Sequence, residues 1–192
     1  MRVKICGITR PEDAQFAEQQ GADAIGVVVF SGGVSPRVVG AEKAREIFAA
    51  VGPFTTTVAV SHTKSEEDLL QMIALHPHAI QISHPFRFDE APGVRIIRVI
   101  GRGDPLPEDC DAVIVDDSHG KGRVFDLSYA RGTVRRSTVP VILAGGLTPE
   151  NVGEAIHRVR PYAVDVASGV ESSPGIKDRK KVSAFIATCR SA

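Results

Sequence analysis

The sequence predicts an α/β protein that forms a single (β/α)8 barrel, the TIM-barrel architecture, over residues 1–192. Short apolar runs rich in β-branched residues recur along the chain, and amphipathic segments with helical spacing lie between most of them. Repeated strand–helix units form either a closed barrel or an open doubly wound sheet. The count of eight runs favours the barrel, although 192 residues is short for this fold.

The eight expected strands are almost continuously apolar rather than alternating. This pattern is typical of parallel strands that are covered on both faces. The expected strands are Val3–Ile5, Ala24–Val29, Thr55–Val60, Ala79–Ile82, Arg95–Ile100, Ala112–Val115, Val139–Leu143 and Ala163–Val166.

The helices between these strands are predicted from apolar residues at positions i, i+3, i+4 and i+7. Start signals accompany two of them: Thr9 and Glu12 have capping-box spacing, and Pro149 follows Thr148 at an expected first helical position. The stretch HPFRFDEAPG, between Ile82 and Arg95, offers little room for a helix. We therefore expect a shortened or missing helix after the fourth strand.

Composition argues against several classes of partner. The chain has 23 basic and 23 acidic side chains and no basic block, which disfavours a nucleic-acid partner. No apolar run approaches the roughly 18 residues of a membrane helix, and no signal-peptide core follows Met1. The three cysteines, Cys6, Cys110 and Cys189, suit neither a disulfide framework nor a zinc site. We expect a reduced, cytoplasmic protein without membrane contact.

Two glycine-bearing segments indicate a phosphate site. Gly145 and Gly146 follow the seventh expected strand, and Ser168 and Gly169 follow the eighth. Backbone N–H groups can approach a phosphate closely at glycine, and a helix N-terminus adds partial positive charge. Barrels of this kind frequently bind phosphate in the loops after strands 7 and 8. A plain strand-to-helix turn is the simpler interpretation of either segment alone.

Cys6 ends the first expected strand, in KICGIT. A free cysteine usually behaves as a small buried hydrophobe, and the apolar helical stripe around Cys189 fits that interpretation. Cys6 differs because active sites of these barrels lie at the carboxyl ends of the strands. A thiolate there could act as a base or a nucleophile.

Two further charged residues are candidates. Asp126, in GKGRVFDL, lies after the sixth expected strand and also suits the N-cap of a following helix. Arg37, in SPR, lies on a glycine-bearing loop after the second strand and could bind a carboxylate through its planar guanidinium or simply be solvated. The six histidines show no spacing that suggests a metal site.

Taken together, these motifs resemble the phosphoribosylanthranilate isomerase family. KICGITRPEDA, SPRVV, GKGRVFD, LAGGLTPENV and VDVASGVESSPGIKD occur in the order and spacing of that family, over nearly the whole chain. The resemblance implies an isomerase of tryptophan biosynthesis that converts N-(5-phosphoribosyl)anthranilate to 1-(2-carboxyphenylamino)-1-deoxyribulose 5-phosphate. It implies no metal or organic cofactor, and a monomer or homodimer acting on a small phosphorylated substrate.

The resemblance also assigns roles to individual residues. It implies that Cys6 is the general base and Asp126 the general acid of an Amadori rearrangement. It further implies that Arg37 binds the anthranilate carboxylate and that Gly145, Gly146, Ser168 and Gly169 bind the phosphate. Asp165, in VDVASG, is expected to touch the amine or the hydroxyls of the substrate.

The chain departs from the family pattern in several places, which include a trimmed helix after the fourth strand and a short loop after the sixth. The usual glutamine–leucine–histidine–glycine ending of the fourth strand reads Gln81-Ile82-Ser83-His84, and Leu127 replaces the tryptophan often found after the catalytic aspartate. Two alternatives remain: a non-catalytic barrel that binds a phosphorylated ligand, and the related isomerase of histidine biosynthesis. The latter resembles a duplicated half-barrel with an aspartate where this chain has Cys6.

Overall fold

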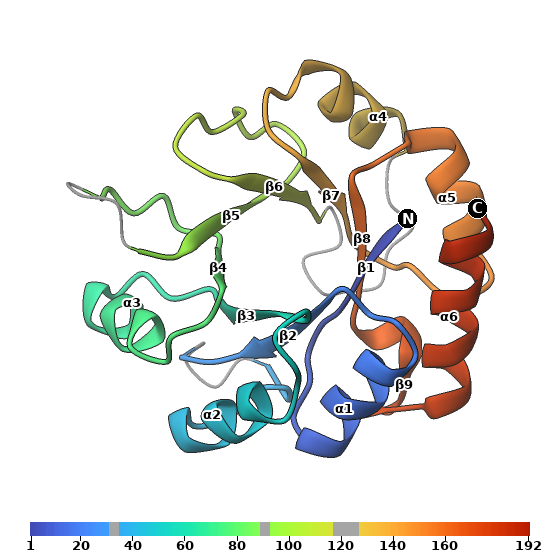
Figure 1. Cartoon of the computed structure of the whole chain (residues 1–192). Coiled ribbons are helices and arrows are strands. Elements are labelled where there is room, and N and C mark those ends of the chain that lie inside the picture. Colours follow the sequence, from blue (N-terminus) through green and yellow to red (C-terminus); the bar gives the residue numbers. More distant parts are fainter. Residues whose placement is uncertain (31–34, 89–92, 117–126) are drawn as a thin grey trace.

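The structure is a computed structural model that describes residues 1–30, 35–88, 93–116 and 127–192. Eight parallel strands form a closed barrel in sequence order, so that β8 pairs with β1 (Figure 1). This confirms the predicted fold class. The strands are β1 (Arg2–Ile5), β2 (Ala24–Val28), β3 (Thr56–Ser61), β4 (Ala79–Ile82), β5 (Arg95–Ile100), β6 (Ala112–Val115), β7 (Val141–Leu143) and β8 (Ala163–Val166).

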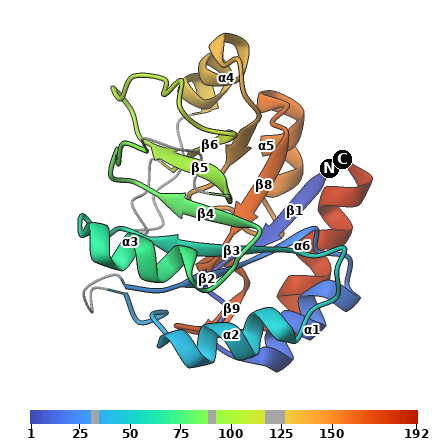
Figure 2. The ribbon, with the colours of Figure 1, turned by 60° about the vertical axis from the view of Figure 1, so that its left-hand side comes forward.

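Helices surround the barrel on its outside (Figure 2). A short 3-10 helix, η1 (Ser168–Val170), and a two-stranded hairpin, β9 (Glu171–Ser173) and β10 (Ile176–Lys177), lie between β8 and the last helix. The helices of the described residues are α1 (Pro11–Gln19), α2 (Ala41–Ala49), α3 (Glu66–Ile73), α4 (Leu127–Arg136), α5 (Val152–Val159) and α6 (Arg179–Ser191). None of these helices is long and apolar enough to cross a membrane.

Alternate residues of each strand face two separate cores, because successive side chains of a strand point to opposite sides. In β1 the outward residues Val3 and Ile5 belong to the apolar layer between the barrel and the helices. Cys6 belongs to the smaller cluster inside the barrel. That inner cluster is completed by Val28, Val58, Val60, Ala79, Ile97, Ala112, Ile114, Ile142, Ala144 and Ala163.

The ring of helices is incomplete beside β5. No helix occurs in the described part of the β4–β5 connection, residues 83–88 and 93–94, in agreement with the prediction. The β5–β6 connection, residues 101–111, also has no helix, which the sequence analysis did not anticipate. Pro105 and Pro107 explain this, since proline lacks the backbone N–H that a helix interior requires.

Arg98 fastens the loops that replace these helices. Its side chain extends from β5 and is 4% exposed. The guanidinium donates hydrogen bonds to the backbone carbonyls of His84 and Phe86 and to a carboxylate oxygen of Asp109. One buried cation therefore holds both connections against the barrel wall.

Two predicted helix starts were wrong in detail. The N-cap of α1 is Arg10 rather than Thr9, whose hydroxyl instead donates to the carbonyl of Gly175 at 2.6 Å. Helix α5 begins at Val152, not at Pro149, because residues 149–151 form a turn. Thr148 still accepts a hydrogen bond from the backbone N–H of Glu150, so it caps this turn rather than the helix itself.

Candidate active site

The predicted site residues of the described chain lie after, or near the end of, strands of the barrel. Cys6 follows β1, and its backbone N–H donates to the carbonyl of Val166 at 2.8 Å, so the β1–β8 ladder continues to it. Gly145 and Gly146 follow β7, and η1 with Ser168 and Gly169 follows β8. Asp126 lies outside the described residues, so its predicted role as acid stays a prediction.

Cys6 is buried, with 7% of its surface exposed. Burial raises the pKa of its thiol because the thiolate loses solvation, and the charge and hydrogen bond of Lys4 act against this rise. The thiol is therefore set between a desolvating apolar cluster and a buried cation. The cation, Lys4, was not predicted from the sequence.

Lys4 is one of the charged residues that sequence reasoning missed. Its ammonium donates to Oδ1 of Asp165 at 2.9 Å and to Oε1 of Gln81 at 3.0 Å, and all three residues are buried. Burial alone would lower the pKa of Lys4, but the charges of Asp165 and Cys6 raise it to about 12. The signal was available: Lys4 shares the inward side of β1 with Cys6, and a lysine is unusual in an apolar strand.

Gly26, on β2, shows how closely this lysine and the thiol approach each other. A Cβ atom at Gly26 would lie 2.8 Å from Sγ of Cys6 and 2.9 Å from Nζ of Lys4. Both distances are shorter than any ordinary carbon contact, so only glycine leaves room for the two groups. Lys4 and Cys6 thus converge on one point of the barrel interior.

Arg37 lies over the turn that follows Cys6. A Cβ atom at Gly7 would be 2.5 Å from Cδ of Arg37, which places the arginine at the same mouth as the thiol. Its guanidinium makes a two-pronged ion pair with Glu171, Nε to Oε1 at 2.8 Å and Nη2 to Oε2 at 2.7 Å. Arg37 is thus presented in the geometry with which arginine binds carboxylates.

Glu171 joins Arg37 to a second buried cation. Nζ of Lys177 donates to Oε1 of Glu171 at 3.0 Å and to the carbonyl of Ala167 at 3.1 Å. Burial alone would raise the pKa of Glu171, but the hydrogen bond from Arg37 and the charge of Lys177 outweigh it and lower the pKa. Sequence reasoning missed both Glu171 and Lys177, because the contact that ties them to the site is with Arg37, 134 positions before Glu171.

The two predicted phosphate loops lie against each other. A Cβ atom at Gly169 would lie 1.9 Å from the carbonyl oxygen of Leu147, so the turn after β8 and the loop after β7 meet at a place where only glycine fits. Asn151 stabilises the loop after β7 by donating from Nδ2 to the carbonyl of Gly146 at 2.9 Å. The pair of loops therefore forms one continuous backbone surface.

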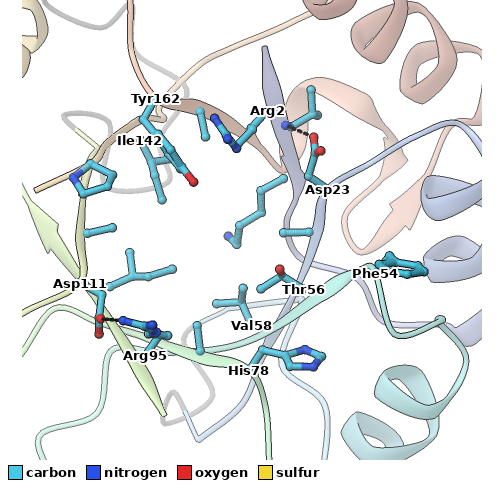
Figure 3. Close-up of a pocket in the computed structure, with 18 of the residues that line it drawn as sticks. Arg2, Asp23, Phe54, Thr56, Val58, His78, Arg95, Asp111, Ile142 and Tyr162 are labelled. Atoms are coloured by element: carbon cyan, nitrogen blue, oxygen red, sulfur yellow. Dashed lines mark hydrogen bonds and ion pairs between the residues drawn. The ribbon is translucent and has the colours of Figure 1, made fainter.

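The other end of the barrel holds a cavity that the sequence did not predict. Its volume is about 560 Å³, and residues at the amino ends of the strands line it, with Lys4 among them. Figure 3 shows Arg95 paired with Asp111 and Arg2 beside Tyr162 around this cavity, while Phe54 points away from it. Within the described residues, no group of three or more His, Cys, Asp or Glu side chains is placed to hold a metal ion.

Comparison with known proteins identifies the family. Residues 3–188 match the family described as N-(5'phosphoribosyl)anthranilate (PRA) isomerase. The chain belongs to this family. The activity of the chain is therefore that of an isomerase of tryptophan biosynthesis. This result favours the isomerase over the non-catalytic barrel and over the isomerase of histidine biosynthesis.

Individual relatives of this isomerase family are similar over their whole length. The N-(5'-phosphoribosyl)anthranilate isomerase of Methanoregula boonei is 64% identical over 192 residues, covering 100% of this chain and 98% of the relative. The crystal structure of phosphoribosyl anthranilate isomerase from Thermus thermophilus is 34% identical, with a TM-score of 0.85, and covers 100% of this chain and 99% of that one. A further structure, 33% identical with a TM-score of 0.82, covers 100% of both chains and holds reduced 1-(o-carboxyphenylamino)-1-deoxyribulose 5-phosphate.

Proposed function

We propose that this chain, as one catalytic domain over residues 1–192, isomerises N-(5-phosphoribosyl)anthranilate to 1-(2-carboxyphenylamino)-1-deoxyribulose 5-phosphate with Cys6 as base and Asp126 as acid. The observation that carries the assignment of the base is the position of the thiol. Cys6 directly follows β1 at the mouth of the barrel, buried beside Lys4 and next to Arg37. Active sites of this fold occur at that end.

The chemistry is an internal redox reaction that needs proton transfers only. Asp126 protonates the ring oxygen of the ribose, the ring opens, and a Schiff base forms. The thiolate of Cys6 then removes the proton from C2 to give an enolamine, which relaxes to the ketone. A positioned proton transfer of this kind typically contributes about 10²–10⁴-fold to the rate.

The two anionic groups of the substrate, its carboxylate and its phosphate, are assigned to Arg37 and to the loops after β7 and β8. Arg37 binds the anthranilate carboxylate through Nη1 and the outer edge of its guanidinium, since the pair with Glu171 uses Nε and one hydrogen of Nη2. Backbone N–H groups of Gly145, Gly146, Ser168 and Gly169 bind the phosphate, supported by the close contact of the two loops. Asp165 contacts the amine or hydroxyls with the oxygen that Lys4 leaves free.

The remaining elements of the proposal concern partners and location. The substrate is a small phosphorylated molecule, and the reaction uses no cofactor, nucleic acid or membrane. The cytoplasm is the proposed location. For assembly we propose a monomer or a homodimer, since an isomerase from Thermotoga maritima, 31% identical to this chain, is described as dimeric and as convertible to monomers. Light scattering of the purified protein distinguishes the two.

The test of the function is steady-state turnover of freshly prepared substrate by the purified protein. Cys6→Ser and Asp126→Asn are expected to lower kcat by about 10²-fold or more, because each removes one proton-transfer group. Cys110→Ser is the matched control, since this half-buried thiol belongs to the β5–β6 connection and should leave the rate unchanged. An inactive wild-type protein, or variants that retain its rate, would refute the proposal.

A further inference from the structure

A buried lysine inside the barrel calls for an explanation beyond packing. Lys4 is 3% exposed and lies among apolar side chains of the inner cluster. Transfer of an ammonium group out of water is costly, and pairing offsets this cost only with good geometry. Apolar side chains of similar volume often serve stability as well as a buried ion pair does. The pair formed by Lys4 and Asp165 therefore points to a role in the site above it.

The strand register places this pair directly beneath the thiol. Lys4 is opposite Asp165 in the pairing of β1 with β8, and Cys6 follows two positions later on the same inward side of β1. Gln81, from β4, accepts a second hydrogen bond from the ammonium. Two acceptors on different strands thus fix the position of Nζ, and the absent side chain at Gly26 leaves space for it to approach Sγ.

We propose that Lys4 is a positioning residue for Cys6: its ammonium, held by Asp165 and Gln81, stabilises the thiolate that takes the proton from the substrate. Lys4 reaches the reaction through the sulfur and has no assigned contact with the substrate. The role of the thiolate rests on the proposed function, whereas the effect of Lys4 on the thiol does not.

The charges around Cys6 support this role. Four charged groups act with it: Lys4 on β1, Asp165 on β8, Lys177 on β10 and Arg37 on the loop after β2. Burial raises the pKa of the thiol, Asp165 raises it further, and Lys177 lowers it. Lys4 is the largest influence that lowers it. Lys4 therefore both neutralises the nearby carboxylate and favours the negative sulfur.

The test is the titration of Cys6 in a Lys4→Met variant. The thiolate is followed by its ultraviolet absorbance, as the difference between proteins with and without a Cys6→Ser change, so that no turnover is required. We expect the pKa of Cys6 to rise in Lys4→Met, because an opposite charge at short range favours the ionised form. Lys43→Met removes an exposed lysine of α2 and serves as the matched control, with an unchanged titration.

The rise in the pKa of Cys6 should also be visible in the kinetics of Lys4→Met. kcat at neutral pH should fall about tenfold or more in Lys4→Met, with little change in KM. The ascending, acidic limb of the pH–rate profile, which follows ionisation of the base, should move to higher pH together with the thiol titration. A structural role alone would lower the amount of folded protein without moving either profile.

A second variant separates the direct effect from the burial of an unpaired carboxylate. Lys4→Met combined with Asp165→Asn removes both charges and keeps the side-chain volumes, so it remains informative if the single variant does not fold. We expect the pKa of Cys6 to stay above that of the wild type, because Lys4 influences the thiol more than Asp165 does. A return to the wild-type pKa in the double variant, or an unchanged pKa in a folded Lys4→Met, would overturn the proposal whether or not the enzyme turns over the proposed substrate.

Discussion

The inside of the barrel and the layer between barrel and helices each contain a buried cysteine, and the two thiols have different surroundings. Cys189 of α6 is 0% exposed and packs in the outer apolar layer. Burial raises its pKa to about 11, and only the N-terminus and Arg190 oppose the rise. Cys6 is also buried but lies among buried charges held by hydrogen bonds. Burial raises the pKa of both thiols, but only at Cys6 does a buried, hydrogen-bonded lysine act against that rise, which makes Cys6 the candidate base.

The two layers also differ in how they tolerate polar groups. The outer layer collects the outward residues of the strands with the apolar stripes of the helices. The interior places Lys4, Gln81 and Asp165 among small apolar side chains. Each of these polar groups has a hydrogen-bond partner, as buried polar atoms require: Lys4 bonds Asp165 on the adjacent strand β8 and Gln81 on the more distant β4. Closure of the sheet, which brings β8 against β1, makes this arrangement possible.

The largest expected effect is that of a methyl group added inside the barrel. Gly26→Ala would place a carbon within 3 Å of both Cys6 and Lys4, so one of them must move. Displacement of a catalytic group by about 1 Å can cost about 10²-fold in rate, and we expect a loss of kcat/KM of that order. Steady-state kinetics measures it.

Gly132→Ala is the control outside the barrel interior. Gly132 lies in α4, where an added Cβ atom meets nothing within 4 Å. The change should leave kcat/KM unaltered and raise the free energy of unfolding by about 0.5–1 kcal/mol, the cost of glycine in a helix. Equal effects of Gly26→Ala and Gly132→Ala on kcat/KM would show that the space beside Cys6 and Lys4 has no special importance for catalysis.

Several features of the molecule follow from sequence patterns because they depend on local periodicity. Four strands, among them Ala79–Ile82 and Ala163–Val166, have the predicted bounds. The position of Cys6 at the barrel mouth follows from the end of a strand and a rule of the fold. Family motifs added the roles of Asp126 and Arg37, which no local pattern specifies.

Other features depend on contacts between distant segments. Arg37 and Glu171 are 134 positions apart, and nothing near either one indicates the pairing. Lys4 and Asp165 meet because the barrel closes, and the register of two strands is not visible in either strand alone. Thr9 failed as a cap for the same reason, since its hydroxyl binds the distant carbonyl of Gly175.

A smaller effect is expected at the thiol of the outer layer. Cys189→Ser buries a hydroxyl in an apolar environment, which should lower the free energy of unfolding by about 1–3 kcal/mol. Denaturant unfolding measures this loss. kcat should equal that of the wild type, because Cys189 lies outside the barrel interior. A loss of turnover as large as that of Cys6→Ser would contradict the assignment of the two thiols.

The smallest expected effect concerns the acidic residue at the barrel mouth and depends on pH. The pKa of Glu171 is lowered in the folded protein, so the unfolded chain binds its proton more tightly. The stabilisation by the carboxylate is therefore present above the unfolded pKa and is lost as the pH falls through the folded pKa. Glu171→Gln should lower the free energy of unfolding at neutral pH by about 1.5 kcal/mol, the lower end of the range for a hydrogen bond to a charged group.

The pH series decides whether this difference arises from ionisation. Once Glu171 is protonated it resembles glutamine, so the unfolding curves of the wild type and Glu171→Gln should converge at acid pH. Glu154→Gln is the control, because its partner Arg158 and Glu154 itself are exposed on α5, and exposed pairs contribute little to stability. A gap between the wild type and Glu171→Gln that persists at acid pH would assign the effect to packing. Glu171 would then stabilise the barrel mouth through the packing of its side chain and not through its negative charge.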